Sequence, residues 1–200
     1  MKILAATNNA GKLREIRALL SGTEVVSPVD LGLHLEVDET GTTFVANATL
    51  KAQAFAKATN LIALADDSGL EVDALNGEPG VYSARYGGPS LDAEGRWRLL
   101  LQEMEPFTAT TERSARFRCA MVAFSADGRT CRAEGTCEGR IACEAVGQNG
   151  FGYDPIFFLP ELHCTMAELD ASTKNSFSHR ANALTAIHPL LIETFPELRT

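Results

Sequence analysis

The first twenty residues alternate between apolar and polar segments in a way that predicts a strand, a polar turn and a helix. Residues 2–6 form an apolar, strand-like run, and residues 7–12 are polar or small. Apolar residues then recur at helical spacing, at Leu13, Ile16, Leu19 and Leu20. The turn presents backbone N–H groups at a helix N-terminus together with Lys12, which favours a phosphate group. It lacks the glycine spacing of a Walker loop, and a plain strand-to-helix connection with an asparagine cap accounts for it equally well.

A second strand-like run, residues 61–65, leads directly into Asp66 and Asp67. Because successive side chains on a strand point to opposite faces, we expect one aspartate to serve a site and the other to support it. Adjacent carboxylates repel one another unless a cation or a donor compensates them, and Mg²⁺ suits such oxygen ligands. The alternative interpretation is a solvated strand end, an N-cap or a turn. Residues 69–75 predict a further strand that forms a hairpin with the first.

A polar hinge at residues 38–42 precedes the clearest helical pattern in the chain. Thr42 or Thr43 is the expected cap, and Asn47 and Lys51 fall outside the apolar face. The apolar stripe consists of Phe44, Ala48, Ala52 and Phe55. The other expected elements are strands at 25–26 and 31–37, a helix over 91–104, and a β-hairpin formed by 115–125 and 130–136.

Residues 147–158 combine glycines, aromatics and a proline. Glycines flank Phe151 and Pro155 stiffens the chain that follows, so the loop can hold an aromatic face open for a planar ligand. Tyr153 and Asp154 would bring polar groups to the same pocket. A tight turn packed into the core is the alternative interpretation.

A basic segment opens the last predicted helix. Ser178 is the expected N-cap, which places His179 and Arg180 in the first turn, where the helix dipole disfavours cations. An anionic or carbonyl-bearing ligand would offset this cost, although a solvated arginine would incur only a small one. Pro189 is expected to end or kink the helix and to leave residues 190–200 as a short tail.

Composition excludes several classes of protein. The 200 residues, 45% of them hydrophobic, suit one globular domain over residues 1–200. A net charge of −8 without any basic run disfavours nucleic acid and anionic membranes as partners. The N-terminal apolar run is too short for a signal peptide and no stretch approaches membrane-spanning length, so a cytoplasmic location is expected. The five cysteines are odd in number and lack a Cys-x-x-Cys pair, which fits packing residues in a reducing compartment.

Six short motifs, in this order along the chain, resemble the inosine/xanthosine triphosphate pyrophosphatases. They are Thr7-x-Asn9-x-x-Lys12, residues 39–41 (ETG), 65–70 (ADDSGL), 79–86 (PGVYSARY), 151–155 (FGYDP) and 178–180 (SHR). The resemblance implies Mg²⁺-dependent hydrolysis of aberrant purine nucleoside triphosphates, such as ITP, dITP and XTP, to the monophosphate and pyrophosphate. It also implies an α/β fold with an elongated central mixed sheet flanked by helices, two lobes around a substrate cleft, and a homodimer.

The same resemblance assigns roles to individual residues. The triphosphate would be bound by Thr7, Asn8, Asn9, Ala10, Gly11 and Lys12. Glu39 and Asp67 would hold Mg²⁺, with Asp67 also accepting the proton of the attacking water and Asp66 as its electrostatic partner. The other substrate-binding positions would be Ser68 as a ligand contact, Phe151 stacked on the base, Gly152, Tyr153 and Asp154 around it, and Lys174, His179 and Arg180 at the purine edge.

Two further function classes remain as alternatives. A pyrophosphatase for modified pyrimidine nucleotides would share the acidic metal site but would not require Lys174, His179 and Arg180. A non-catalytic nucleotide sensor would keep the phosphate turn and the aromatic residue, yet would have little use for Glu39 and Asp67 together.

Lysine and arginine side chains only donate hydrogen bonds, so they suit the keto oxygen of hypoxanthine or xanthine and oppose the amino group of adenine.

Overall fold

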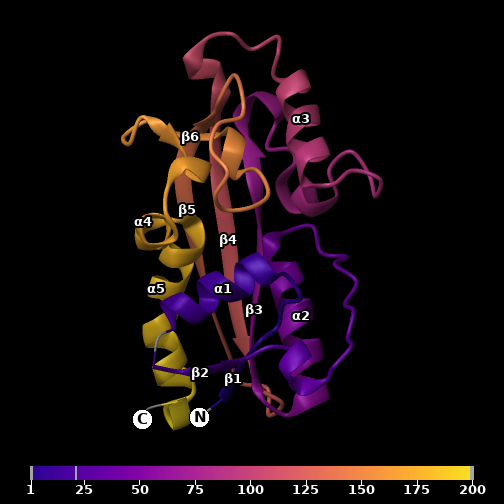
Figure 1. Ribbon diagram of the computed structural model, residues 1–200. Helices are drawn as coiled ribbons and strands as arrows, with labels where there is room; N and C mark the ends of the chain where they lie inside the picture. The colour runs from indigo at the N-terminus through magenta and orange to yellow at the C-terminus, as the bar shows by residue number, and fades with distance from the viewer. Residues whose placement is uncertain (1, 21, 199–200) are drawn as a thin grey trace. The chain divides into compact units, whose positions relative to one another are not determined.

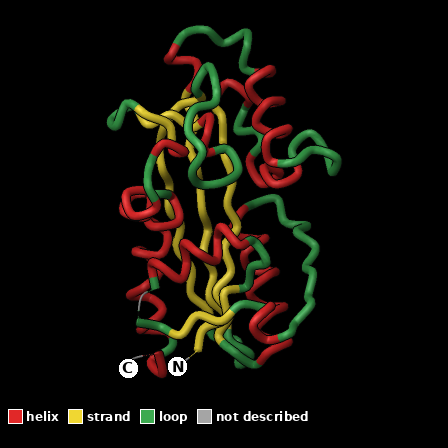
Figure 2. The backbone as a smooth tube through the Cα atoms, in the orientation of Figure 1, coloured by secondary structure: helices red, strands yellow, loops and turns green. Residues whose placement is uncertain are grey.

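The computed structural model describes residues 2–20 and 22–198 as an α/β protein (Figures 1 and 2). Its strands are β1 (Lys2–Ala5), β2 (Glu24–Val26), β3 (Ile62–Val72), β4 (Ser114–Phe124), β5 (Thr130–Ile141), β6 (Phe157–Leu159) and β7 (Cys164–Thr165). Its helices are α1 (Ala10–Leu19), α2 (Phe44–Thr59), α3 (Ala93–Glu103), α4 (Ala171–Phe177) and α5 (His179–Thr194). The predicted strand, turn and helix at the N-terminus are confirmed.

The strands are ordered β2-β1-β3-β4-β5-β6-β7 in one mixed sheet. β1 pairs in parallel with β2 and β3, so that Leu4 lies opposite Val26 on one side and Ala63 on the other. β6 pairs antiparallel with β5 and β7. The predicted α/β class with helices flanking a mixed sheet is therefore confirmed.

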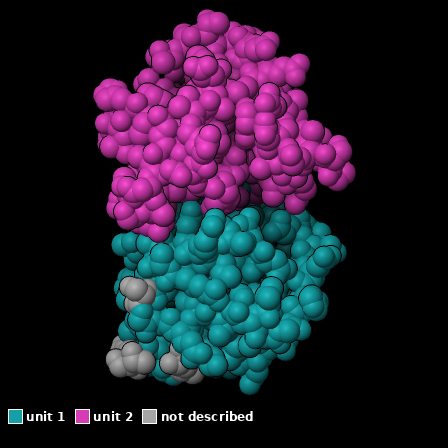
Figure 3. All heavy atoms as spheres, viewed as in Figure 1, with its two compact units in different colours: residues 1–67, 119–135, 179–200 teal, residues 68–118, 136–178 magenta. Residues whose placement is uncertain are grey.

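The chain divides into two compact units (Figure 3). Unit 1 comprises residues 1–67, 119–135 and 179–200, and unit 2 comprises residues 68–118 and 136–178. Strands β3, β4 and β5 contribute residues to both units, whereas β1 and β2 belong to unit 1 and β6 and β7 to unit 2.

The alternation of side chains along β1 and β3 divides the interior of unit 1 into two layers. Ile3 and Leu64 pack in a cluster with residues of α1 and α5, whereas Leu4 and Ala65 pack in a second cluster with residues of α2. These two clusters correspond to the two faces of a strand, because neighbouring side chains point in opposite directions. The apolar stripe predicted for residues 44–55 is confirmed, since all four of its residues are buried and Thr43 caps the helix.

One close contact fixes α5 against β5 within unit 1. A Cβ atom added at Gly135 would lie 2.2 Å from the backbone nitrogen of Ala183 and 2.3 Å from the carbonyl oxygen of His179. Real Cβ atoms do not approach backbone atoms so closely, so the first turns of α5 rest directly on the strand backbone at this glycine.

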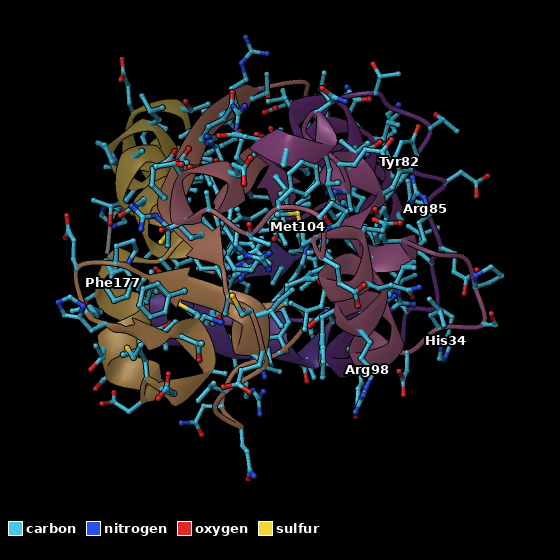
Figure 4. The ribbon with its side chains drawn as sticks, turned by 90° about the horizontal axis from the view of Figure 1, so that it is seen from above. His34, Tyr82, Arg85, Arg98, Met104 and Phe177 are labelled. Atoms are coloured by element: carbon cyan, nitrogen blue, oxygen red, sulfur yellow. The ribbon has the colours of Figure 1, made fainter. Side chains whose placement is uncertain are left out.

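Unit 2 has its own apolar core and a buried arginine. Met104 is fully buried and Arg98 points outward, as Figure 4 shows. Arg113 donates hydrogen bonds to the backbone carbonyls of Met104, Phe107, Ile141 and Ala142, at 2.7–2.8 Å. One guanidinium group therefore joins two backbone segments, residues 104–107 and 141–142, that are distant from one another in the sequence.

Three sequence-based expectations were wrong. Asp66 and Asp67 do not end a strand, because β3 continues through them to Val72 and the hairpin expected at 69–75 does not form. Both aspartates find donors on the adjacent helices, so the chain has no need to turn there. Residues 31–37 form no strand; Leu33, Leu35 and Val37 pack against the α2 side of unit 1, whereas Leu31 is exposed. The tail expected from residue 190 onward is instead helical as far as Thr194, because the last helix continues through Pro189.

The five cysteines are free thiols, and none of the helices within residues 2–20 and 22–198 is both long and apolar enough to cross a membrane.

Candidate active site

The phosphate-type turn of unit 1 is stabilised by its own side chains. The Asn9 carboxamide oxygen accepts hydrogen bonds from the backbone N–H groups of Gly11, at 2.9 Å, and Lys12, at 3.1 Å. The hydroxyl of Thr7 accepts a third bond from the Asn9 N–H group. Asn9 is therefore the N-cap of α1, as one interpretation of the sequence predicted. This cap presents Lys12 in the first turn, near the β1 end that carries the turn.

Four charged side chains form a continuous chain of ion pairs on the α1 and α5 side of unit 1. Lys12 Nζ lies 3.0 Å from Asp66 Oδ2, and Arg180 contacts the same oxygen through Nη2 at 3.0 Å and Nε at 3.3 Å. Arg180 Nη1 in turn donates to the carboxylate of Glu15 on α1. The Arg180 side chain is only 1% exposed, so these carboxylates are the partners that compensate its burial.

The charges around Asp66 keep it ionised. Burial by itself would raise the pKa of this carboxyl group, but the positive charges of Lys12 and Arg180 outweigh burial and hold the pKa well below its ordinary value. Burial by itself would lower the pKa of Arg180, but the negative charges of Asp66 and Glu15 outweigh burial and raise the pKa, so the guanidinium stays charged. Asp66 thus acts as a permanent anion between two cations.

Asp67 points to the opposite face of β3, toward α2. Lys51 Nζ lies 2.6 Å from Glu39 Oε1 and 3.4 Å from Asp67 Oδ1, so the two carboxylates converge on one ammonium group. The amide of Asn47 donates to the other Asp67 oxygen, Oδ2, at 3.1 Å. The expected division of the two aspartates between opposite faces is confirmed by these separate sets of partners.

Asp67 differs from Asp66 in its proton affinity. Burial and the negative charge of Glu39 raise the pKa of Asp67 and outweigh the lowering effect of Lys51, Lys12 and the Asn47 hydrogen bond. For Lys51 the opposing carboxylates of Asp67, Asp66 and Glu39 outweigh burial and raise its pKa. The site thus contains two neighbouring carboxyl groups whose surroundings shift their pKa values in opposite directions, upward for Asp67 and downward for Asp66.

No group of three His, Cys, Asp or Glu side chains arranged to hold a metal ion occurs among the described residues. The pair Glu39 and Asp67 nevertheless converges on a single cation, the ammonium of Lys51. Mg²⁺ is commonly bound through one or two carboxylates, with water and substrate phosphate completing its coordination, so two hard oxygen donors fit it.

A second cluster lies within unit 2, around the predicted aromatic loop. Asp154 Oδ2 accepts hydrogen bonds from Lys174 Nζ at 2.6 Å and from the backbone N–H of Phe151 at 2.8 Å. Lys174 Nζ also lies 4.7 Å from the centre of the Phe151 ring, in a cation–π contact. Lys174 and Asp154 are buried, whereas Phe151 is half-buried and outside the core cluster of this unit. One carboxylate oxygen therefore orders both the loop and its basic neighbour.

Tyr153 and Ser83 connect this loop to the rest of unit 2. The Tyr153 hydroxyl donates to the carbonyl of Ser83 at 2.9 Å, and the Ser83 hydroxyl accepts the N–H of Leu70 on β3. Ser83 belongs to the segment Gly80–Arg85, on which Tyr82 and Arg85 form a cation–π pair; both are labelled in Figure 4. The motif at 79–86 therefore supports the loop through its backbone.

The predicted substrate and metal residues fall into both units. Unit 1 holds Thr7, Asn8, Asn9, Ala10, Gly11, Lys12, Glu39, Asp67, His179 and Arg180, and unit 2 holds Ser68, Phe151, Gly152, Tyr153, Asp154 and Lys174. Lys174 and Arg180, both predicted at the purine edge, have different partners: Asp154 for the lysine, Asp66 and Glu15 for the arginine. The predicted roles of all these residues stay predictions.

Sequence reasoning missed two polar residues, Glu15 and Asn47. Glu15 follows Lys12 by one helical turn and Asn47 precedes Lys51 by one turn. Lys12 was already assigned to the phosphate turn, so the polar residue one turn after it is a signal that could have identified Glu15.

The chain is similar to known proteins over most of its length. Residues 3–190 match the sequence profile of the Ham1 family. A protein of Thioalkalivibrio sulfidiphilus named dITP/XTP pyrophosphatase is 53% identical over 188 residues, which cover 92% of this chain and 95% of that protein. Among solved structures, a HAM1 protein from Coxiella burnetii has a TM-score of 0.86 at 41% identity, over 96% of this chain and 99% of that one. The Staphylococcus aureus Ham1 protein has a TM-score of 0.84 at 43% identity, over 96% and 98%.

Proposed function

Because the chain belongs to the Ham1 family, we propose that it hydrolyses aberrant purine nucleoside triphosphates such as ITP, dITP and XTP. The products are the nucleoside monophosphate and pyrophosphate, and the effect is to remove these nucleotides from the pool used for nucleic acid synthesis. Relatives named dITP/XTP pyrophosphatase at 53% and 50% identity support this substrate class.

The observation that carries the proposal is the convergence of Glu39 and Asp67 on the Lys51 ammonium, with Lys12 and Asp66 on the other face of β3. A nucleotide sensor would need cations for the phosphates but no pair of carboxylates gathered at one point. An enzyme that activates water beside a bound metal ion needs both the cationic side chains for the phosphates and the pair of carboxylates.

Glu39 and Asp67 would hold Mg²⁺, whose positive charge, when it is bound, neutralises the phosphate oxygens and favours attack by water. Asp67 accepts the proton of the water, and its raised pKa suits this role because a base with higher proton affinity is a more effective acceptor. Lys12 and Lys51 neutralise the charge that builds up on the triphosphate in the transition state. Thr7, Asn8, Asn9, Ala10 and Gly11 place the N-terminus of α1 near the phosphates.

Base recognition is assigned to the cluster of unit 2. Phe151 stacks on the purine, Lys174 donates to its keto oxygen, and Gly152, Tyr153 and Asp154 shape the pocket around the base. Ser68 is a further ligand contact. His179 and Arg180 also belong to the proposed purine-edge set, on the strength of the resemblance in residues 178–180. Adenine presents an amino group where inosine presents oxygen, so ATP is a poor substrate.

The proposal extends to assembly and location. The resemblance supports a homodimer, and we also propose a cytoplasmic location. The net charge of −8 without a basic run disfavours nucleic acid and anionic membranes as partners. Light scattering after gel filtration measures the dimer directly.

A product analysis tests the reaction. Purified protein incubated with ITP and Mg²⁺ is expected to yield IMP and pyrophosphate in one step, and chromatography of an early time point should show no IDP. EDTA should abolish the reaction. A transient IDP peak would indicate stepwise loss of phosphate and would contradict the proposed mechanism.

A substrate panel tests the base specificity. ITP, XTP and dITP should be hydrolysed much faster than ATP and the pyrimidine triphosphates, as measured by phosphate release with coupled pyrophosphatase. Preferential hydrolysis of a modified pyrimidine triphosphate would favour the alternative enzyme class, and nucleotide binding without hydrolysis would favour a sensor.

A further inference from the structure

Asn47 is a fully buried polar residue on α2 that has no role in the reaction as described so far. Its carboxamide oxygen accepts the backbone N–H of Gly41 at 2.8 Å, and its amide nitrogen donates to Asp67 Oδ2 at 3.1 Å. One side chain thus bridges the turn that follows Glu39 and the strand that carries Asp67.

The two partners fix the orientation of the amide. A backbone N–H can only donate, so the Asn47 oxygen must face Gly41, and the amide nitrogen must then face the carboxylate. Aspartate at this position could not donate to Asp67, and a shorter side chain could not span both partners. The position therefore requires the particular chemistry of asparagine.

Gly41 allows the contact to be close. A Cβ atom at Gly41 would lie 2.7 Å from the Asn47 carboxamide oxygen and 2.7 Å from the Cβ of Ala46. Any side chain would push the turn away from α2 and carry Glu39 with it. The short contact therefore depends on two residues, a glycine at position 41 and an asparagine at position 47.

Lys51, one helical turn after Asn47, completes the arrangement. The lysine contacts Asp67 Oδ1 while the asparagine contacts Oδ2, so α2 supplies one donor to each oxygen of the same carboxylate. Lys51 also contacts Glu39, so the two residues of α2 together contact both carboxylates.

We propose that Asn47 is a positioning residue that sets the separation and orientation of the Glu39 and Asp67 carboxylates for a divalent cation. The inference rests on the proposed function, because it assumes that these two carboxylates hold the metal. Residues that orient metal ligands through hydrogen bonds typically influence metal affinity by about 10- to 100-fold when they are replaced.

The test uses the full-length protein and Mn²⁺ as a paramagnetic probe. Asn47→Leu keeps the volume of the buried side chain and removes both hydrogen bonds, and Gly41→Ala disturbs the same contact from the turn. Gln53→Ala, on the same helix, is the matched control. Electron paramagnetic resonance of nucleotide-free protein should show Mn²⁺ affinity reduced about 10-fold or more in Asn47→Leu and Gly41→Ala and unchanged in Gln53→Ala.

A second readout is the Mg²⁺ concentration that half-saturates ITP hydrolysis, which should rise by a similar factor while the KM for ITP at saturating Mg²⁺ changes little. Thermal melting identifies how much of each variant is folded. A structural role alone would lower the melting temperature and the amount of active enzyme without moving the metal midpoint.

The outcomes separate the two proposals. If the wild-type protein binds Mn²⁺ and hydrolyses ITP, but folded Asn47→Leu and Gly41→Ala have the wild-type metal midpoint, the assignment of Asn47 is wrong. If the wild-type protein neither binds Mn²⁺ nor hydrolyses ITP, the proposed function fails first.

Discussion

The two clusters of polar residues are built in different ways. In unit 1, Glu15, Asp66 and Arg180 come from α1, β3 and α5, and the Arg180–Asp66 contact joins residues 114 positions apart in the sequence. In unit 2, Asp154 and Phe151 belong to one loop, and Lys174 follows only 20 positions later. The first cluster depends on tertiary structure for its existence, whereas the second is largely a local structure held by one carboxylate.

The difference indicates what each cluster can tolerate. A network of buried ion pairs loses a compensating charge for several groups when one member is removed. A loop ordered by a single acceptor can lose an aromatic side chain without disturbing its neighbours. Substitution of Arg180, Asp66 or Glu15 should therefore affect activity and stability together, whereas substitution of Phe151 should reduce substrate binding with little loss of stability.

Asp67→Asn should have the largest effect. If Asp67 accepts the proton of the attacking water, kcat for ITP should fall by about 10²- to 10⁴-fold, because the amide of asparagine cannot act as a base near neutral pH. The melting temperature should stay close to that of the wild-type protein despite this fall in kcat. Steady-state kinetics and thermal melting measure both, and a variant with near-wild-type kcat would remove Asp67 from the mechanism.

Arg180→Met compared with Lys174→Met tests the contrast in stability. The first substitution removes the cation that contacts two buried carboxylates, Asp66 and Glu15, and the second removes the cation that contacts one, Asp154. Loss of a partner from a buried ion pair costs about 3–5 kcal/mol, so Arg180→Met should lower the free energy of unfolding by an amount in this range and by more than Lys174→Met does.

Urea denaturation measures both free energies, and the ratio of ITP to ATP turnover adds a second comparison. If Arg180→Met left stability unchanged and reduced only ITP turnover, the arginine would act at the purine edge alone, and the contrast in stability between the two clusters would fail.

Phe151→Ala should reduce substrate binding with little loss of stability. Stacking of a base on an aromatic side chain contributes about 1–3 kcal/mol, and Phe151 is half-buried outside the core cluster. Phe157→Ala is the control, because Phe157 is fully buried in the same unit and its truncation should cost about 3–5 kcal/mol of stability. Calorimetric titration with a non-hydrolysed ITP analogue and thermal melting separate these effects. Equal destabilisation by both variants would identify Phe151 as a core residue.

Lys51→Met should also shift the pH dependence of kcat, in addition to any fall in kcat caused by the loss of its charge beside the phosphates. Asp67 must be ionised to accept a proton, so kcat falls as the pH drops through its raised pKa. Lys51 lowers that pKa, and its removal should move the acid limb of the profile to higher pH by about one unit or more. Lys57→Met, at an exposed position on the same helix, should leave the limb in place. A shift toward lower pH in Lys51→Met would mean that another group controls the limb.

The elements that were predicted well depend on local sequence. Alternation placed Asp66 and Asp67 on opposite faces of β3, and the Asn9 cap and the apolar stripe of α2 followed from their own spacing. The end of the strand at Asp67 was predicted wrongly because adjacent acids favour turns only when nothing else compensates them. The compensating donors lie on α1, α2 and α5, and the partners of Arg180 could not be inferred from neighbours in the sequence.

The contact between Gly135 and the first turns of α5 limits which amino acids are tolerated at position 135. No other residue fits there without moving the helix backbone, so a saturation library at position 135 should recover only glycine among functional variants. The position of the helix that carries His179 and Arg180 is thus set by a backbone-to-backbone contact with β5. A side-chain substitution within the helix does not alter that contact. The amide protons in this part of α5 should consequently be among the slowest to exchange with deuterium in unit 1.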